Sequence, residues 1–215
     1  ALADQLIDSD WTSASLSEII GEALECDRQI ATNACLDLSA SFERDAACDK
    51  YLTPLLYYKG FQALQLQRVA SWFWKNDRCE VAFFLQSKMA EVFHVDIHPG
   101  AKIGSGIMLD HATGLVIGET AIIGNNVSVL HSVTLGGNGN SGGKRHPTIG
   151  DGVMISAGAK LIGDITIGEG TKIGAGSLVL KSMPAHATVV GVPAAVVGMP
   201  LDEIPALNRN QNLDG

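Results

Sequence analysis

The sequence predicts an α+β protein in which an α-helical domain, residues 1–95, precedes a parallel β-helix, residues 96–200. Two observations carry this fold class. Aliphatic residues recur at every sixth position between residues 97 and 179, whereas residues 1–93 lack that repeat and place apolar residues at helical spacing. A chain of 215 residues can bury one good core or two small ones, which suits a helical piece followed by a repeat piece.

The helical domain ends in its two best-marked helices. Thr53 followed by Pro54 is a typical helix start, and the apolar residues after it keep a helical spacing as far as Asn76. Because several apolar faces have no partner in the pattern, we expect this domain to pack against copies of itself. The predicted helical segments are approximately 13–27, 29–40, 42–50, 53–76 and 78–93.

The repeat predicts a triangular coil. A hexapeptide is too short for a strand, a crossover helix and a returning strand, but it suits one short strand and a corner, so three hexapeptides close one coil. Inward aliphatic residues of successive coils then stack, and glycines relieve crowding at the corners. The repeated positions are Ile97, Ile103, Leu109, Leu115, Ala121, Val127, Val133, Ile149, Ile155, Leu161, Ile167, Ile173 and Val179.

One interruption divides the repeat. Val133 and Ile149 are sixteen residues apart, which is two hexapeptide steps plus four, so part of this segment must leave the prism. Residues 136–147 are rich in glycine and cannot hold a core of their own. A long loop in a strict repeat is typical of a functional loop, and disorder is the alternative. After residue 200, residues 201–215 are predicted to form a flexible C-terminal tail.

Composition narrows the function classes. The net charge is −8, and residues 1–96 hold eight Lys and Arg against fifteen Asp and Glu, which argues against nucleic acid or an anionic membrane surface as a partner. No apolar run approaches a membrane span, and no charged-then-apolar leader follows Ala1. The four cysteines form no CxxC pair. We therefore expect a cytoplasmic protein.

Polar chemistry gathers at three places beside the repeat. Asp110 and His111 directly follow the inward Leu109, so they are predicted to lie at a corner and face outward. A histidine there can act as a general base once a carboxylate fixes its tautomer. Asp96 lies fifteen residues earlier, close to one coil, and can be that neighbour. A surface histidine without a function is the alternative interpretation.

The foot of the glycine loop holds Arg145 and His146. The histidine can be a second base or a polarising donor, and the planar guanidinium suits a carboxylate. A phosphate-binding loop ending at Lys144 is excluded by spacing, because such a loop needs glycine at position 138 and Ser or Thr at position 145. The wide gaps between the histidines argue against a zinc site, so no metal is expected.

Beyond the repeat, several runs resemble bacterial and plant-type serine acetyltransferases. The resemblance covers about residues 41–200 and includes the helical domain, which many hexapeptide acyltransferases lack. It implies a left-handed β-helix, an exception to the usual right-handed crossover. It also implies acetyl transfer from acetyl-CoA to the hydroxyl of L-serine, the first step of cysteine biosynthesis. The matching runs are Asp45-Ala-Ala-Cys-Asp-Lys-Tyr, Thr53-Pro-Leu-Leu-Tyr-Tyr-Lys-Gly-Phe, Val95-Asp-Ile-His-Pro, Met108-Leu-Asp-His-Ala-Thr-Gly and Ser132-Val-Thr-Leu-Gly-Gly.

The same resemblance assigns roles in catalysis and serine binding. It makes His111 the general base that takes the serine hydroxyl proton, and it makes Asp96 the residue that orients the imidazole. It places Asp45 and Asp110 at the amino group of serine. Direct attack on the thioester needs no acetyl-enzyme, and backbone N–H groups of the glycine loop can stabilise the oxyanion.

Residues of a neighbouring subunit are implied to complete the site. Arg145 would bind the serine carboxylate, and His146 would assist catalysis beside it. Acetyl-CoA enters as a co-substrate, without a permanently bound cofactor, in the groove between adjacent prisms. The residues implied to contact CoA are Gly137, Ala157, Lys172 and Ala175.

Family likeness also implies partners. A homotrimer is expected, joined by the helical domain into a dimer of trimers, and L-cysteine is expected as a feedback inhibitor at the serine site. Family members often end in an isoleucine that docks into cysteine synthase, whereas this sequence stops at Asp214-Gly215. A cysteine synthase complex is therefore expected only if the native C-terminal tail is longer.

Two other function classes compete with serine acetylation. One is a related hexapeptide acyltransferase that acts on a sugar or antibiotic hydroxyl. The other is a non-catalytic trimeric scaffold or a zinc lyase. Asp45 and the helical domain favour serine acetylation over acetylation of a sugar or antibiotic. Metal analysis of the purified protein distinguishes a serine acetyltransferase from a zinc lyase.

Overall fold

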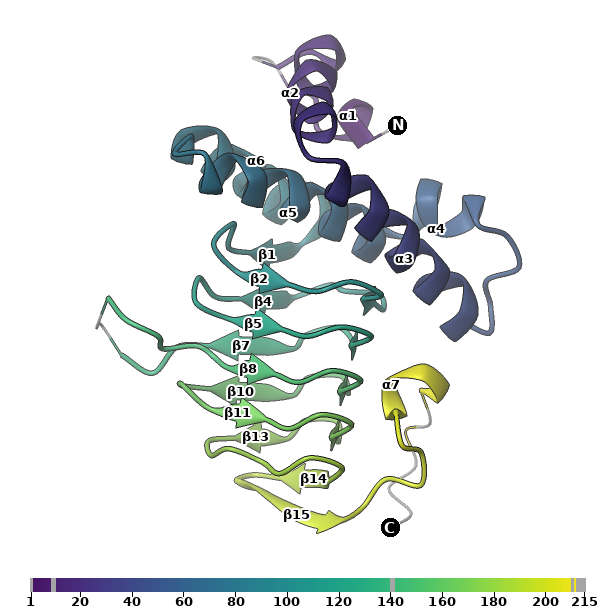
Figure 1. The fold of residues 1–215 in the computed structure, drawn as a ribbon, viewed down its shortest axis with the longest axis vertical. Helices are drawn as coiled ribbons and strands as arrows, with labels where there is room; N and C mark the ends of the chain where they lie inside the picture. Colours follow the sequence, from purple (N-terminus) through teal and green to yellow (C-terminus); the bar gives the residue numbers. More distant parts are fainter. Residues whose placement is uncertain (1, 9–10, 140–141, 210, 212–215) are drawn as a thin grey trace.

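A helical domain caps a stack of β-coils in the computed structural model, which describes residues 2–8, 11–139, 142–209 and 211 (Figure 1). The helices lie across one end of the stack, and the coils follow each other away from them. The α+β fold class is therefore confirmed. The helices are α1 (Leu2–Gln5), α2 (Ser13–Cys26), α3 (Arg28–Arg44), α4 (Leu52–Tyr57), α5 (Lys59–Lys75), α6 (Cys79–Phe93) and α7 (Pro205–Asn208).

Two of the predicted helix boundaries were wrong. The segments 29–40 and 42–50 were expected as separate helices, but α3 runs unbroken to Arg44, and the Ser41 hydroxyl donates to the Asp37 carbonyl within it at 3.0 Å. The segment expected over 53–76 is divided at Tyr58, whose extended backbone (ψ 103°) ends α4 and starts α5. This break lets α5 enter against the β-stack in a new direction.

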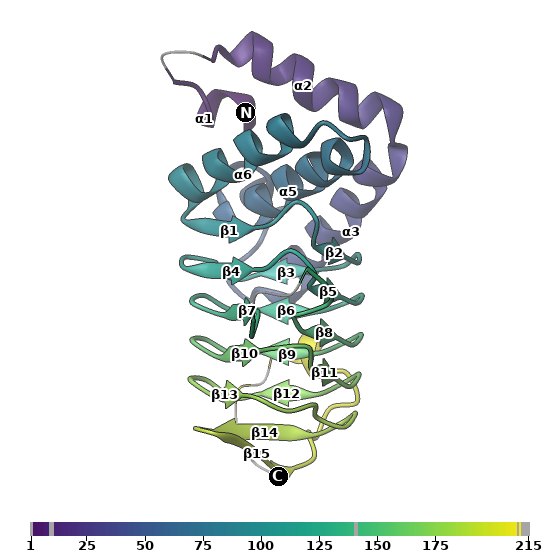
Figure 2. The same ribbon diagram turned by 90° about the vertical axis from the view of Figure 1, so that its left-hand side faces the viewer.

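The β-region is a triangular prism of parallel strands, residues 95–198 (Figure 2). Among the described residues, sheet A has the order β1-β4-β7-β10-β13, sheet B has β11-β8-β5-β2, and sheet C has β15-β14-β12-β9-β6-β3. The pairs are parallel except β14–β15. The strands are β1 (Val95–Ile97), β2 (Lys102–Ile103), β3 (Met108–Leu109), β4 (Leu115–Ile117), β5 (Ile122–Ile123), β6 (Ser128–Val129), β7 (Thr134–Gly136), β8 (Thr148–Ile149), β9 (Met154–Ile155), β10 (Lys160–Ile162), β11 (Thr166–Ile167), β12 (Lys172–Ile173), β13 (Leu178–Val179), β14 (Thr188–Gly191) and β15 (Ala194–Gly198).

Strand pairing corrects the expected repeat frame. Ile97 pairs with Ile117, twenty residues later, whereas Ile117 pairs with Leu135, eighteen residues later. The first coil therefore contains two extra residues, and they fall in the corner 110–114. Every predicted repeat position is still buried except Ile103, which is partly buried. The predicted positions after the insertion are buried although the pairing has shifted by two residues, because the residues two places before the paired positions also face the core.

The segment between β7 and β8 departs from the regular coils where the repeat predicted an interruption, although Gly136 still pairs within β7. Leu135 pairs with Leu161, twenty-six residues later, so this coil is eight residues longer than the eighteen of a regular coil. Figure 1 shows the loop projecting from the edge between sheets A and B. We call this edge, with corners 118–121 and 137–147, the loop edge. The edge between sheets C and A, with corners 110–114, 130–133, 156–159 and 174–177, is called the His111 edge.

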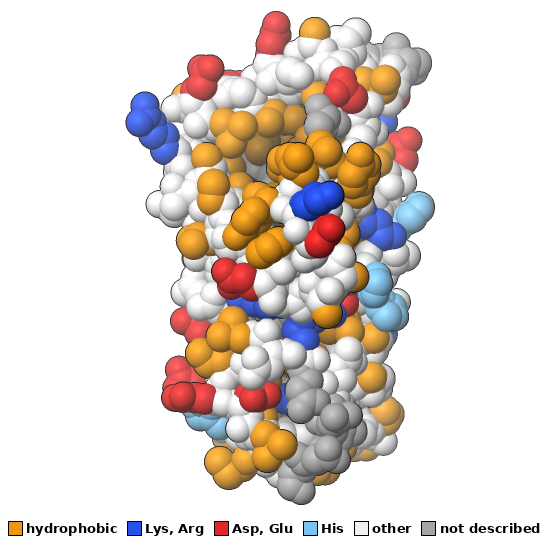
Figure 3. Space-filling model, turned by 90° about the vertical axis from the view of Figure 1, so that its right-hand side faces the viewer, with side chains coloured by type: hydrophobic (Ala, Val, Ile, Leu, Met, Phe, Trp, Pro, Cys, Tyr) orange, Lys and Arg blue, Asp and Glu red, His pale blue; other side chains and the backbone are white. Residues whose placement is uncertain are grey.

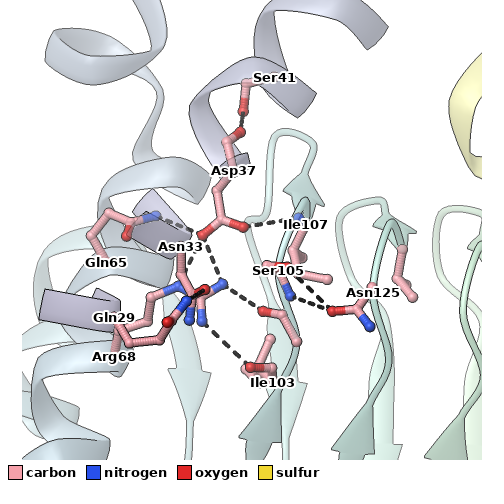
Figure 4. Close-up of polar contacts among 12 residues, drawn as sticks. Gln29, Asn33, Asp37, Ser41, Gln65, Arg68, Ile103, Ser105, Ile107 and Asn125 are labelled. Carbon is pink, nitrogen blue, oxygen red and sulfur yellow. Dashed lines mark hydrogen bonds and ion pairs between the residues drawn. The ribbon is translucent and has the colours of Figure 1, made fainter. Parts of the chain in front are cut away.

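A buried ion pair joins the helical domain to the prism (Figure 4). Arg68 of α5 pairs with Asp37 of α3 at 2.7 Å, and both side chains are almost fully buried. Asp37 also accepts the backbone N–H of Ile107 at 2.9 Å, and Arg68 donates to the carbonyl of Gly104 at 2.7 Å. These contacts connect two helices to the first coil, so they fix the orientation of the helices on the prism.

The C-terminal segment differs from the flexible tail that the sequence predicted. Residues 201–209 fold back along sheet C, and α7 lies beside the prism below α3 (Figure 1). Pro205 and Ala206 are buried, and the Ser128 hydroxyl donates to the Ala206 carbonyl at 2.9 Å. Ala206 packs in one apolar cluster with Leu130 and Met154, so this short segment is held by contacts that its own sequence does not reveal.

The face that carries α3, α4 and α7 is unusually apolar in its helical half (Figure 3). Leu52, Leu55 and Tyr57 of α4 are exposed there, with 76% of Tyr57 accessible. No helix of the described residues is long and apolar enough to cross a membrane. All four cysteines are free thiols.

Candidate active site

The insertion in the first coil places His111 outside the prism. His111 and Ala112 both have positive φ, 55° and 59°, so the chain bulges outward at this corner. The His111 side chain is 73% exposed, whereas only 13% of the Asp110 side chain is accessible. His111 Nε2 lies 3.8 Å from Asp110 Oδ2. His111 therefore faces solvent at a corner, as the sequence predicted, whereas the Asp110 side chain is largely covered.

A cavity of about 690 Å³ opens beside His111. It brings together Asp45, Asp110 and His111, three residues that the sequence placed in one site. Tyr58 also lines it, and burial together with a hydrogen bond to Asp45 raises the pKa of the Tyr58 hydroxyl well above its usual range. The tyrosine therefore stays neutral and can donate to the carboxylate. Lys59 and Thr113, which bond each other, close one side.

Gly60 explains how residues from the helical domain reach this corner. A Cβ at Gly60 would lie 2.1 Å from the carbonyl oxygen of Leu109, so only glycine lets the start of α5 rest on β3. Asp45, at the end of α3, and Tyr58, before α5, are thereby held over the corner 110–114. The insertion and the glycine together form the cavity.

Arg209 enters the same cavity from the C-terminal segment. Its guanidinium pairs with Asp110, and Nη1 donates to the Arg44 carbonyl at 3.2 Å. Sequence reasoning missed this residue because it treated residues 201–215 as a flexible tail. The one available signal was Pro205, a typical start of a short helix.

A second polar group lies on the loop edge. His146 is buried, and its Nδ1 lies 2.9 Å from the Thr120 hydroxyl. Arg145 pairs with Glu119, which holds the pKa of that carboxyl below its usual range. Burial is the main cause that lowers the pKa of His146, and the positive charges of Arg145 and Lys144 lower it further. His146 is therefore predominantly neutral near pH 7.

The two polar groups occupy different edges of one prism. His111 lies on the His111 edge, between sheets C and A, and Arg145 and His146 lie on the loop edge, between sheets A and B. One subunit does not bring them together. Asp96 lies on sheet A between these edges, and its carboxylate accepts the Gln86 side-chain N–H at 2.7 Å. Within the described residues it does not contact His111.

Comparison with known proteins identifies the family. A family model described as "Serine acetyltransferase, N-terminal" matches residues 1–66, and one described as "Bacterial transferase hexapeptide (six repeats)" matches residues 146–181. A serine acetyltransferase of Escherichia coli K12 is 52% identical over 214 residues, which cover all of this chain and 78% of that protein. This chain belongs to the serine acetyltransferase family. It is an acyltransferase enzyme.

Solved structures agree with this membership. The crystal structure of a serine acetyltransferase from Vibrio cholerae is 49% identical, with a TM-score of 0.98, and the match covers all of this chain and 83% of that one. A serine acetyltransferase from Neisseria gonorrhoeae is 51% identical, with a TM-score of 0.95 over 99% of this chain and 82% of that one. The helical domain and the β-helix of the enzyme thus match together.

The residues expected to contact CoA are also spread over the prism, on both edges and on sheet C. Ala157 and Ala175 lie on the His111 edge, where Gly158 N–H donates to the His131 carbonyl at 3.0 Å and Gly176 N–H donates to the Ala157 carbonyl at 2.9 Å. Gly137 lies at the foot of the loop, beside Arg145 and His146. Lys172 is buried on β12 of sheet C.

The histidines of the enzyme do not form a metal centre in the described residues. The rings of His111 and His131 meet edge to face at 5.8 Å on one edge, and His146 lies on another. No group of three or more His, Cys, Asp or Glu side chains there could hold a metal ion.

Proposed function

We propose that His111 is the general base in direct acetyl transfer from acetyl-CoA to L-serine. The observation that carries the proposal is the cavity in which the exposed His111 imidazole faces the carboxylates of Asp45 and Asp110. The imidazole takes the hydroxyl proton as serine Oγ bonds to the thioester carbon. The tetrahedral intermediate then expels the CoA thiolate, which receives that proton as the C–S bond breaks.

The two carboxylates suit the ammonium group of an amino acid, and a neighbouring subunit is proposed to supply Arg145 and His146 for the carboxylate end. The separation of these residues on two edges of one prism supports a shared site between subunits, as in a closed ring of three. A Neisseria gonorrhoeae serine acetyltransferase, 53% identical, was solved in complex with serine. A further serine acetyltransferase structure, 47% identical to this chain, was solved in complex with cysteine, which supports L-cysteine as an inhibitor here.

Asp96 remains proposed as the residue that orients His111 in the assembled enzyme. Its carboxylate is exposed on β1 and bound by Gln86, so it must exchange that partner. Asp96→Asn should then lower kcat, whereas Asp110→Asn should chiefly raise KM for serine. An unchanged kcat in Asp96→Asn would remove Asp96 from the mechanism.

Acetyl-CoA is proposed to lie between the His111 edge of one prism and the loop edge of the next. Gly137, Ala157, Lys172 and Ala175 are the proposed contacts, and the enzyme needs no permanently bound cofactor. A Brucella abortus serine acetyltransferase, 47% identical, was solved in complex with coenzyme A. This site would hold the thioester next to the serine hydroxyl, so that the two substrates react as in an intramolecular reaction.

Assembly and cellular role complete the proposal. The exposed apolar side chains of α4 support contacts that join two trimers through their helical domains. O-acetylserine would serve cysteine biosynthesis in the cytoplasm, where the free cysteines stay reduced. A complex with cysteine synthase is proposed only for a chain with a longer C-terminus.

Release of CoA thiol from acetyl-CoA tests the proposal. L-serine should give the highest kcat/KM among a panel of hydroxyl acceptors that includes sugars and aminoglycosides. His111→Ala should lose at least about a hundredfold in kcat, the usual scale for a general base. The side chain is exposed, so this variant should keep its assembly in sedimentation. A preference for a sugar, or a near-normal rate in His111→Ala, would contradict the proposal.

A further inference from the structure

Thr120 binds the foot of the glycine loop through both its side chain and its backbone. Its hydroxyl oxygen accepts the backbone N–H of Arg145 at 3.0 Å and that of His146 at 3.2 Å. The same hydroxyl lies 2.9 Å from His146 Nδ1, and the Thr120 backbone N–H lies 3.2 Å from that nitrogen. The Thr120 carbonyl accepts from Lys144 Nζ at 2.8 Å. One residue thus contacts three consecutive residues of the loop.

The donors and acceptors at His146 Nδ1 determine where the ring proton lies. A backbone N–H can only donate, so Nδ1 must accept from Thr120 and carries no proton. The Thr120 oxygen already accepts two backbone N–H groups, and its own proton is then free to point at Nδ1. In the neutral imidazole the remaining proton is therefore on Nε2.

The surroundings keep this ring neutral and in place. Burial lowers the pKa of His146, and the cations of Arg145 and Lys144 act in the same direction. The ring rests on Gly118, where an added Cβ would lie 2.0 Å from Nε2. Among the described residues, Nε2 has no hydrogen-bond partner. A fixed N–H donor without a partner suits an anionic oxygen of a ligand.

We propose that Thr120 is a positioning residue that fixes His146 as the neutral Nε2–H tautomer, so that His146 donates to an anionic oxygen and does not act as a second base. The inference rests on the proposed function for its ligand, which is either the carboxylate of the amino acid or the oxyanion of the tetrahedral intermediate. The tautomer itself belongs to the free protein.

The tautomer is measured without any substrate, by 15N NMR of the histidine ring nitrogens in the whole enzyme, with the His146 signal assigned by its loss in His146→Gln. The expected wild-type signal is a protonated Nε2 and an unprotonated Nδ1 near pH 7. A protonated Nδ1 would overturn the proposal. This measurement stands even if the enzyme proves to prefer another acceptor than serine.

Two substitutions test the role of the hydroxyl. Thr120→Val removes it while keeping the size and the backbone N–H, so the pKa of His146 should rise and kcat/KM should fall by about tenfold, the scale of one neutral hydrogen bond. Thr120→Ser keeps the hydroxyl and should stay within about threefold of wild type. Equal pKa and kcat/KM in wild type and Thr120→Val would overturn the positioning role.

The kinetic pattern also separates the two oxygen sources. A raised KM for serine at constant kcat in Thr120→Val would assign the donor to the carboxylate. A lowered kcat would assign it to the oxyanion. If Thr120→Val fails to fold, the wild-type NMR signal and the Thr120→Ser rates still decide the proposal.

Discussion

His98 and His146 show how the fold changes single side chains before any ligand binds. Burial is the first cause that lowers the pKa of each imidazole. Glu119 opposes the shift in both cases, because its negative charge favours the protonated ring. The folded protein therefore prefers both histidines neutral, the form in which one ring nitrogen donates a hydrogen bond and the other accepts one.

Acidification is predicted to destabilise the folded protein through these two residues. The unfolded chain takes up protons first, because its histidines keep a pKa of about 6.5 while the folded ones lie lower. Their contribution to the free energy of unfolding is complete above about pH 6.5 and is lost as the pH falls toward the folded pKa. Urea titrations from about pH 7.5 to about pH 5 measure this loss. His146→Gln should show a shallower pH dependence, and an unchanged slope would contradict the assignment.

The junction between helices and prism depends on the buried pair of Asp37 and Arg68. Asp37→Ala leaves the Arg68 guanidinium buried without its counter-ion, so it should cost about 3–5 kcal/mol of the free energy of unfolding. Glu22→Ala is the matched control, because the Arg78–Glu22 pair is exposed and should be worth less than about 1 kcal/mol. Chemical denaturation of both variants measures the difference. Similar losses in the two variants would show that the junction does not depend on the buried pair.

The C-terminal segment is predicted to compete with serine. Arg209 engages Asp110, the carboxylate proposed to hold the substrate ammonium group. Arg209→Ala should therefore lower KM for L-serine by about three- to tenfold at similar kcat, the range of one partly buried polar contact. Arg209→Lys keeps the positive charge and should resemble wild type. A higher KM in Arg209→Ala would mean that Arg209 binds the substrate and does not exclude it.

Sequence patterns predicted elements with a strong period and missed those defined by long-range contacts. The six-residue repeat gave the β-helix, its inward residues and the loop at 136–147, because each inward position repeats the same local environment. The two-residue insertion at 110–114 escaped notice, since residues two places before each strand centre are also apolar and buried. Tyr58 and Arg209 reach the cavity only through the packing of α5 and α7, for which single-sequence patterns hold little signal.

Site prediction followed the same division. Asp45, Asp110 and His111 were predicted together, mainly by family resemblance, and the cavity does unite them. Asp96 was expected beside His111 on the basis of a coil of eighteen residues, but the first coil has twenty, and the structure pairs Asp96 with Val116. No sequence pattern pointed to Thr120, because its contacts form only when the end of the loop, residues 144–146, folds back onto the corner 118–121.

At the scale of the whole molecule, the central claim is that the active site is shared between subunits. His111 and His146 lie on different edges of the same prism, and no bending of a closed β-helix brings these edges together. A ring of three prisms would place the His111 edge of one subunit beside the loop edge of the next. Each interface would then hold one complete site.

Mixed assemblies of His111→Ala and His146→Ala subunits test this claim most directly. Each variant alone should be nearly inactive in CoA thiol release. After equimolar co-refolding, a shared site predicts recovery to about one quarter of the wild-type rate, because random trimers pair an intact His111 with an intact His146 at that fraction of interfaces. Wild type refolded in the same way provides the reference rate. A mixture no more active than its two separate components would contradict the shared site.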